Sequence, residues 1–318
     1  MGVYGIMLQL LLLLAGLGVF LAGIGMAEGG LSNAPKQRLR NVFIKISKNK
    51  FAGVAAGAGV TAVLHSSSAS TVMVVGLVNT GLLTLTQAAP IIMGANIGTT
   101  ITAQMLQFQG LGLTHWFAAG GAAGMFMRMA KAPKIQLAGS VLAGVGLVFS
   151  GLYLMAHSME FLAAAPAVAH FFASKTNPFV LLALGLALTA AIQSSTAAMG
   201  LLVTLVLTPS AAGGNLLGFH QAAFAVLGMN IGTCITALLG AAGASQNAKR
   251  AAVIHVLFNT LGALLFLPVL LFTPLTAALS ALPPATAIAV FHTVFNLSTT
   301  AVLIWFVNPL VRLSEVIV

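Results

Sequence analysis

Two long apolar segments, residues 51–80 and 178–207, each carry a polar tetrapeptide near the middle. The two tetrapeptides are His65-Ser66-Ser67-Ser68 and Gln193-Ser194-Ser195-Thr196. Each flank holds about 11–15 residues, or roughly 16–23 Å of helix. A hydrocarbon core is about 30 Å thick, so neither flank crosses a bilayer alone. The pattern predicts two re-entrant helical hairpins, each with its polar residues at the tip.

The rest of the chain is also too apolar for a soluble fold. Of 318 residues, 59% are hydrophobic and only 5% are charged, whereas a soluble domain carries about 25% charged residues. The net charge of +10 does not indicate nucleic-acid binding, because the basic residues fall in short loops between apolar runs. We therefore expect an all-α polytopic membrane protein whose other helices cover residues 6–27, 86–107, 112–127, 135–157, 218–240, 251–273 and 284–308.

The basic residues also predict a topology. If both hairpins return to the side they enter from, then residues 31–50, residues 128–134, Lys249, Arg250 and Arg312 all lie in the cytoplasm. Lys175 is then the only basic residue outside, in agreement with the positive-inside rule. A single crossing by residues 51–80 would instead place the cluster at 128–134 outside. We expect the N-terminus outside and the C-terminus in the cytoplasm.

An internal repeat relates the two halves. GANIGTTITA at 94–103 recurs as GMNIGTCITA at 228–237, and an offset of 128 residues carries His65 to Gln193. An odd number of crossings separates the two copies, so the second copy is expected to be inverted, as in many secondary transporters. The predicted fold has two inverted repeats, two re-entrant hairpins and discontinuous helices. The first repeat covers residues 1–134 and the second covers residues 135–318.

The hairpin tips have the chemistry of an anion site. The chain has no Asp, and its three carboxylates, Glu28, Glu160 and Glu315, lie at the ends of apolar segments. A half-helix that begins after each tetrapeptide would offer free N–H groups and a positive dipole end, and the hydroxyls add donors. The alternative is that these serines only satisfy interhelical partners. The candidate substrate-binding residues at the tips are Ser66, Ser67, Ser68, Gln193, Ser194, Ser195 and Thr196.

The two GxNIGT motifs have the chemistry of a cation site. Their glycines allow a helix to unwind and expose carbonyls, and neutral oxygens must serve where no carboxylate is available. The alternative is a glycine-lined helix-packing face. The candidate sodium ligands are Asn96, Thr99, Thr100, Asn230, Thr233, Gln193 and Ser194; Asn96 and Asn230 are also candidates for the substrate site. A His-x-x-Phe-Asn pattern at 255–259 and 292–296 is expected to form interhelical hydrogen bonds.

The paired motifs resemble the type II sodium/phosphate cotransporter family. That family is similar in having two QSSS-type motifs in inverted repeats, each followed by GxNIGT; here they read HSSSAST and GANIGTT, then QSSTAAM and GMNIGTC. The resemblance covers nearly the whole chain. It implies co-transport of sodium and inorganic phosphate across the cytoplasmic (inner) membrane, and a homodimer. His65 departs from the family pattern, which has Gln, and an imidazole titrates near neutrality.

Several other functions compete with symport. A phosphate exporter and a sodium-coupled transporter of another small oxyanion remain open alternatives. A passive channel would not need matched sites between inverted halves. An intramembrane enzyme would need an acid–base or metal constellation such as HExxH, and the sequence has none. A non-enzymatic transporter is the function expected, with sodium, phosphate and lipid as partners and no nucleic acid.

Overall fold

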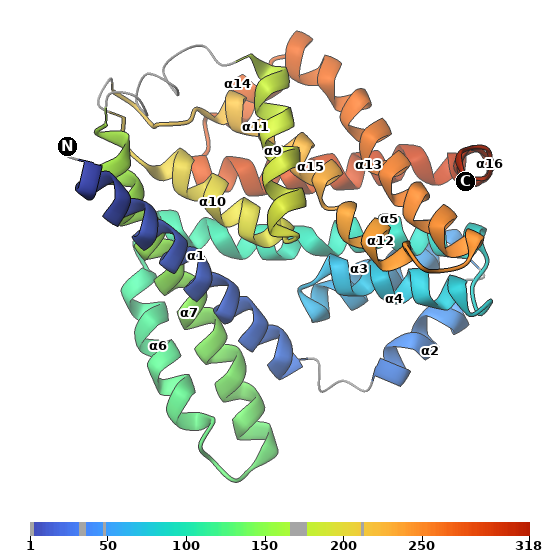
Figure 1. The fold of residues 1–318 in the computed structure, drawn as a ribbon, viewed down its shortest axis with the longest axis horizontal. Coiled ribbons are helices and arrows are strands. Elements are labelled where there is room, and N and C mark those ends of the chain that lie inside the picture. Colours follow the sequence, from blue (N-terminus) through green and yellow to red (C-terminus); the bar gives the residue numbers. More distant parts are fainter. Residues whose placement is uncertain (1–2, 32–35, 47–48, 166–176, 211–212) are drawn as a thin grey trace.

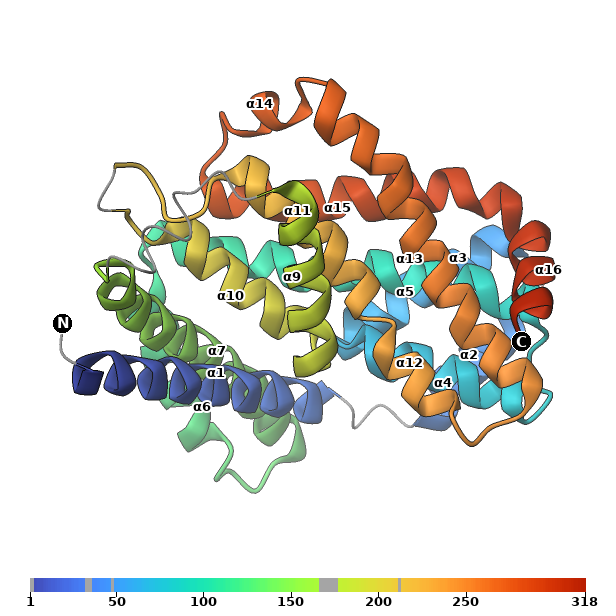
Figure 2. The same cartoon turned by 45° about the horizontal axis from the view of Figure 1, so that its top comes forward.

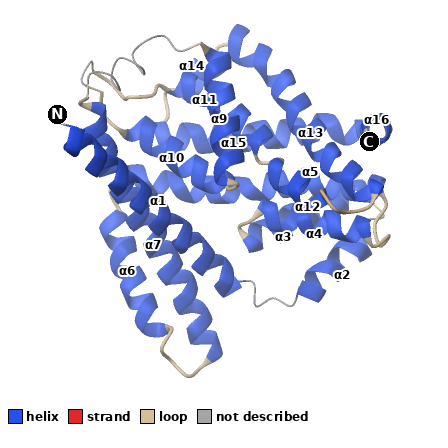
Figure 3. Cartoon of the chain, viewed as in Figure 1, coloured by secondary structure: helices blue, strands red, loops and turns tan. Residues whose placement is uncertain are grey.

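The computed structural model describes residues 3–31, 36–46, 49–165, 177–210 and 213–318, and these form an almost entirely helical protein (Figures 1 and 3). Within this part of the chain the only β feature is an isolated bridge between Pro209 and Asn215. In chain order the elements are α1 Val3–Leu31, α2 Lys36–Ile46, α3 Lys50–Leu64, α4 Ser67–Asn79, α5 Leu85–Leu106, η1 Gln107–Leu111, α6 Thr114–Met127, α7 Pro133–Ala163, α9 Pro178–Ile192, α10 Ser195–Leu207, α11 Phe219–Gly232, α12 Ile235–Ala241, α13 Gln246–Phe272, α14 Leu275–Leu279, α15 Pro284–Leu303, η2 Ile304–Phe306 and α16 Val307–Ile317.

The helices have the lengths that a bilayer requires. Among the described residues, five helical stretches are long and apolar enough to cross a membrane: Tyr4–Ala27, Pro133–Ala163, Phe219–Ala241, Gln246–Phe272 and Pro284–Ile317. The expectation of an all-α, multi-pass membrane protein is thereby confirmed. Lys175, the one basic residue expected outside, lies beyond the described residues.

Each polar-centred segment forms two short helices that contact one another, α3 with α4 and α9 with α10. The breaks fall at His65–Ser66 and at Gln193–Ser194, inside the predicted tetrapeptides. All four short helices are apolar, and each is shorter than a membrane span. Whether they re-enter from one side of the bilayer, and whether the two repeats are inverted, stay predictions.

Three helices, α1, α6 and α7, form a bundle beside the rest of the molecule (Figure 1). Glycines let these helices approach closely: a Cβ added at Gly16 would lie 3.0 Å from the carbonyl oxygen of Gly151. Likewise, a Cβ at Gly124 would lie 2.8 Å from the carbonyl oxygen of Gly139. Backbones packed this closely are typical of membrane helix interfaces, where small residues replace the hydrophobic effect as the basis of association.

Two other helix pairs share one packing arrangement. Helix α3 packs along α5, and α9 packs in the same way along α11. Helix α10 joins this part to the three-helix bundle, because Phe20 of α1 fits against Gly200 of α10 beside Leu152 of α7. Helix α10 also packs against α5, α11 and α15, so it links the bundle to the rest of the molecule.

Two expected helices are interrupted in the structure. The segment expected at 218–240 is broken by a turn at Thr233 and Cys234 into α11 and α12. The segment expected at 284–308 ends earlier, at Leu303, and continues through η2 into the amphipathic α16.

Candidate functional site

The two hairpin tips have the same backbone conformation. His65 and Gln193 end their helices in the left-handed region, with φ of 52° and 58°. Ser66 and Ser194 follow in extended conformation, both with φ of −139°, and cap the next helix. This combination reverses the chain sharply, since the left-handed residue ends one helix and the serine begins another.

Each capping serine uses its oxygen in the same way. The N–H of Ala69 donates to Ser66 Oγ at 3.2 Å, and the N–H of Ala197 donates to Ser194 Oγ at 3.2 Å. The hydroxyl hydrogen of each serine remains available as a donor. Helices α4 and α10 begin at Ser67 and Ser195, inside the tetrapeptides and not after them as expected.

A cavity of about 230 Å³ brings the two tips together. It is lined by three residues of α1 and by both tetrapeptides: Leu21, Ile24, Gly25, His65, Ser66, Ser67, Ser68, Gln193, Ser194, Ser195 and Thr196. All the tip residues predicted to bind substrate therefore lie around one space, although 128 positions separate the matched residues. The contribution of α1 was missed, because an apolar helix carries no sequence signal for lining a polar cavity.

The cavity can hold an anion without a fixed cation. Neither Lys nor Arg is among the described residues that line it. Within the described residues, the N–H groups of Ser67 and Ser68 have no backbone acceptor, and the same holds at Ser195 and Thr196. Two helix N-termini, each equivalent to about half a positive charge, can therefore attract an anion, and the serine and threonine hydroxyls of the tips can donate hydrogen bonds to it.

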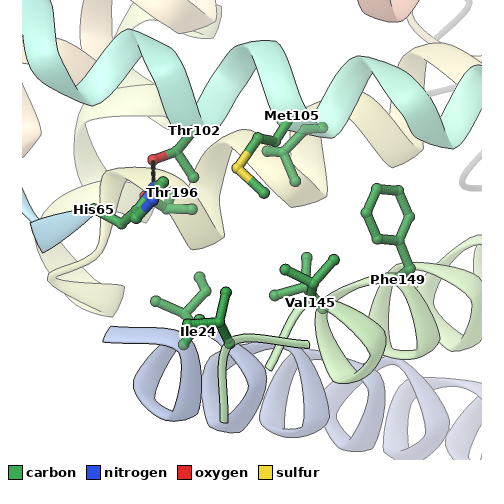
Figure 4. A pocket seen from close by; sticks show the side chains of 11 residues that line it. Ile24, His65, Thr102, Met105, Val145, Phe149 and Thr196 are labelled. Carbon is green, nitrogen blue, oxygen red and sulfur yellow. Dashed lines mark hydrogen bonds between the residues drawn. The ribbon is translucent and has the colours of Figure 1, made fainter. Parts of the chain in front are cut away.

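A second, mostly apolar cavity of about 70 Å³ adjoins the first and shares Ile24, His65 and Thr196 with it. Figure 4 shows His65 and Thr102 of α5 at one end of this space, with Val145 and Phe149 of α7 across it. His65 Nδ1 lies 3.5 Å from Thr102 Oγ1. The imidazole therefore lies between the polar cavity and an apolar one.

The GxNIGT glycines are packing residues. Helix α5 is continuous through residues 94–103, so the expected unwinding is wrong for the first motif. In the second motif the helix breaks only after Gly232. A Cβ at Gly94 would collide with the carbonyl of Val54, and a Cβ at Gly228 with that of Leu182. The alternative of a glycine-lined packing face is what the structure shows.

The polar side chains of these motifs are buried and hydrogen-bonded to their own helices. Asn96 Nδ2 donates to Ile92 O at 3.0 Å, and Asn230 Nδ2 donates to Val226 O at 2.9 Å. The hydroxyls of Thr99, Thr100 and Thr233 donate to carbonyls at 2.8–3.1 Å in the same manner. Each Asn keeps its amide oxygen as an acceptor. None of these five residues lines the cavity between the tips.

The two His-x-x-Phe-Asn patterns make fewer interhelical bonds than expected. Asn259 Nδ2 lies 3.3 Å from Cys234 Sγ. Both ring nitrogens of buried His255, and Nδ1 of buried His292, have no hydrogen-bond partner among the described residues. The interhelical interpretation thus fits Asn259 but is wrong for His255. In the described part of the chain, no group of three or more His, Cys, Asp or Glu side chains could hold a metal ion.

Two broken-helix pairs around one polar cavity, in a polytopic helical protein, are the arrangement expected of a secondary transporter. The sequence matches the Na+/Pi-cotransporter family over residues 19–157 and again over residues 152–282. The chain belongs to this family of transporters, and the match supports phosphate transport as its activity.

Individual relatives agree with this assignment. "Uncharacterized protein YqeW" of Bacillus subtilis is 32% identical over 94% of this chain and 95% of its own length. "Putative inorganic phosphate export protein YjbB" of Escherichia coli is 32% identical over 98% of this chain, which spans 56% of that relative. Mouse "Sodium-dependent phosphate transport protein 2A" is 37% identical over 30% of this chain and 15% of its own length. No solved structure matches the chain.

Proposed function

We propose that this protein is a sodium-coupled symporter of inorganic phosphate that binds the anion between the two hairpin tips. One observation carries the proposal: two matched serine-rich helix starts, far apart in sequence, line a single polar cavity. Phosphate has several oxygens that accept hydrogen bonds, and the cavity offers hydroxyl and backbone N–H donors from opposite sides. Residues Ser66, Ser67, Ser68, Gln193, Ser194, Ser195 and Thr196 are the proposed binding set.

Sodium coupling would supply the free energy that inward phosphate transport requires. Moving a divalent anion into a negative-inside cell costs about 4.6 kcal/mol per 100 mV, and co-transported sodium offsets this cost. The proposed sodium ligands are neutral oxygens, because none of the three carboxylates lies in a motif. They are Asn96, Thr99, Thr100, Asn230, Thr233, Gln193 and Ser194, and Asn96 and Asn230 are also proposed for the substrate site. The homodimer, the external N-terminus and the cytoplasmic C-terminus complete the proposal.

The test is phosphate uptake into liposomes that contain the purified protein. We expect saturable uptake with an inward sodium gradient and little with potassium. Ser67→Ala and Ser195→Ala should weaken phosphate binding more than tenfold together, because a hydrogen bond to a charged group contributes about 1.5–3 kcal/mol. Neither residue is the capping serine, so both helices keep their caps.

Ser158→Ala is the matched control. Ser158 is also buried, but its hydroxyl donates to its own helix in the three-helix bundle at 2.9 Å. Its uptake should equal that of the wild type. Uptake that ignores sodium would contradict symport, and uptake that survives both serine changes would contradict the site.

Phosphate export is the second candidate. It is favoured by the similarity to the Escherichia coli protein whose name describes export. The membrane potential alone drives a divalent anion outward, so an exporter needs no sodium. Phosphate efflux from loaded vesicles that is driven by potential and indifferent to sodium would identify an exporter and reject symport.

A further inference from the structure

A polar cavity of about 310 Å³ lies away from the hairpin tips. It is formed by the beginnings of α3 and α5 and by the turn from α15 into α16. Its lining residues are Lys50, Thr86, Gln87, Ile304, Trp305, Val307 and Asn308. One is a cation and none is an acid, so the cavity favours a negatively charged ligand.

Lys50 is held at this cavity by aromatic rings. Its Nζ lies 4.0 Å from the centre of the Trp305 ring and 5.3 Å from that of Phe51. The two rings meet edge to face, with their centres 5.7 Å apart. A cation over an aromatic face is stabilised by the ring quadrupole. The ammonium is therefore positioned, and no carboxylate among the lining residues neutralises it.

The neutral side chains add hydrogen-bond donors. Gln87 Oε1 accepts the N–H of Thr84 at 2.9 Å, as part of the capping box that begins α5. This bond uses the amide oxygen and leaves the two N–H groups of Gln87 as donors. Asn308 and Thr86 contribute an amide and a hydroxyl beside it. An oxyanion in the cavity would thus meet a cation and amide donors.

The surface around the cavity is apolar and exposed. Trp305, Phe51 and Phe306 are 65%, 52% and 51% exposed. Trp is enriched at the level of lipid headgroups, where its ring has an apolar body and a polar edge. A free oxyanion would make no use of these rings, whereas a lipid can place its headgroup in the cavity and its acyl chains against them.

The cavity also lies at a basic end of the molecule. Figure 2 shows α2, α16 and the start of α13 at the same end, as does Figure 1. These elements carry Arg40, Lys45, Arg250 and Arg312. A basic end is expected on the cytoplasmic side, where anionic lipids give the membrane surface a negative potential.

We propose that this cavity binds the headgroup of an anionic phospholipid, with Lys50 and the amides of Gln87 and Asn308 on the phosphate and Trp305 at the lipid interface. The site is separate from the transport cavity and does not depend on what the protein transports.

The first test measures the phosphatidylglycerol that the purified full-length protein retains from mixed phosphatidylcholine and phosphatidylglycerol vesicles. Mass spectrometry should show enrichment of phosphatidylglycerol on the wild type. Lys50→Gln should lower the enrichment roughly tenfold, because the lipid phosphate then loses a charge-assisted hydrogen bond inside the cavity. Lys134→Gln, the same charge change on exposed Lys134 outside the cavity, should change it much less, because it removes only a general attraction to the anionic surface.

The second test uses Gln87→Glu. Glutamate preserves the capping box, because its carboxylate still accepts the N–H of Thr84, but it adds a negative charge to the cavity. Retained phosphatidylglycerol should fall, while the unfolding midpoint of the protein should not. Wild-type retention in both Lys50→Gln and Gln87→Glu would overturn the proposal. Displacement of the lipid by inorganic phosphate would also overturn it, in favour of a free-anion site.

Discussion

The two hairpin tips share a backbone conformation and differ in two side chains, His65 against Gln193 and Ser68 against Thr196, which keeps the hydroxyl. Both reverse the chain with a left-handed residue followed by a capping serine, and their φ angles agree within a few degrees. The left-handed residue is His65 in the first tip and Gln193 in the second. Non-glycine residues rarely adopt this conformation, so its presence in both tips shows that the turn is built into the repeat.

The comparison shows which tip residues the turn requires and which can differ between the two tips. Capping requires an oxygen at Ser66 and Ser194, and both tips supply it. The left-handed position constrains only the backbone, so the side chain there is free to differ. The His65 ring lies beside Thr102 and lines both cavities. Gln193 lines only the polar cavity.

The largest expected effect comes from placing a negative charge at either tip. Ser67→Asp and Ser195→Asp should each reduce phosphate uptake more than a hundredfold. Two unit charges about 4 Å apart repel by about 4 kcal/mol at an effective dielectric constant of about 20. Both proteins should remain folded, because an acidic residue in the first helical turn is favourable. Uptake assays and thermal unfolding measure the two properties separately.

Ser67→Asn and Ser195→Asn are the controls for this prediction. Asparagine has nearly the size of aspartate but no charge, so these variants should lose much less uptake than the aspartates. A large loss from aspartate at one tip, with none at the other, would break the equivalence of the tips and assign the anion to one of them.

A smaller and equal effect is expected from removing the caps. Ser66→Ala and Ser194→Ala each leave one helix N–H without its acceptor, which costs about 1 kcal/mol of unfolding free energy. Chemical unfolding in detergent should show the same loss for both variants, within experimental error. Thr204→Ala is a suitable control, because this buried hydroxyl donates within α10 but does not cap it. Unequal losses would show that the two turns differ in strength despite their matching angles.

Much of this architecture could be predicted from the sequence, because lipid restricts the length and polarity of the helices that cross it. The apolar runs gave the spanning helices, and the polar interruptions gave the helix breaks at residues 65–66 and 193–194. The repeat also indicated that Ser66–Ser68 and Ser194–Thr196 act together, and one cavity contains both sets. A polar cluster within an apolar segment is costly in lipid, so its presence at the same position in both repeats strongly indicates a functional site.

The GxNIGT motifs could not be interpreted as reliably. Glycine permits both an unwound helix and a close packing contact, and sequence alone does not distinguish them. The structure shows contact at Gly94 and Gly228, where the neighbouring helix leaves no room for a Cβ. The sequence also could not predict that α1 lines the cavity, because Ile24 and Leu21 have the same sequence signature as lipid-facing residues.

The smallest expected effect concerns His65, whose counterpart in the second tip is Gln193. An imidazole gains a proton on acidification, and a protonated His65 would attract an anion in the cavity it lines. Among the described residues, no other titratable side chain lines either of the two adjoining cavities. The wild type should therefore gain a few-fold in apparent phosphate affinity on acidification, relative to His65→Gln. Phosphate itself titrates in this range, so only the difference between the two proteins at each pH is informative. Parallel pH profiles would show that His65 is a turn residue like Gln193, with its ring committed to Thr102 and no part in binding the anion.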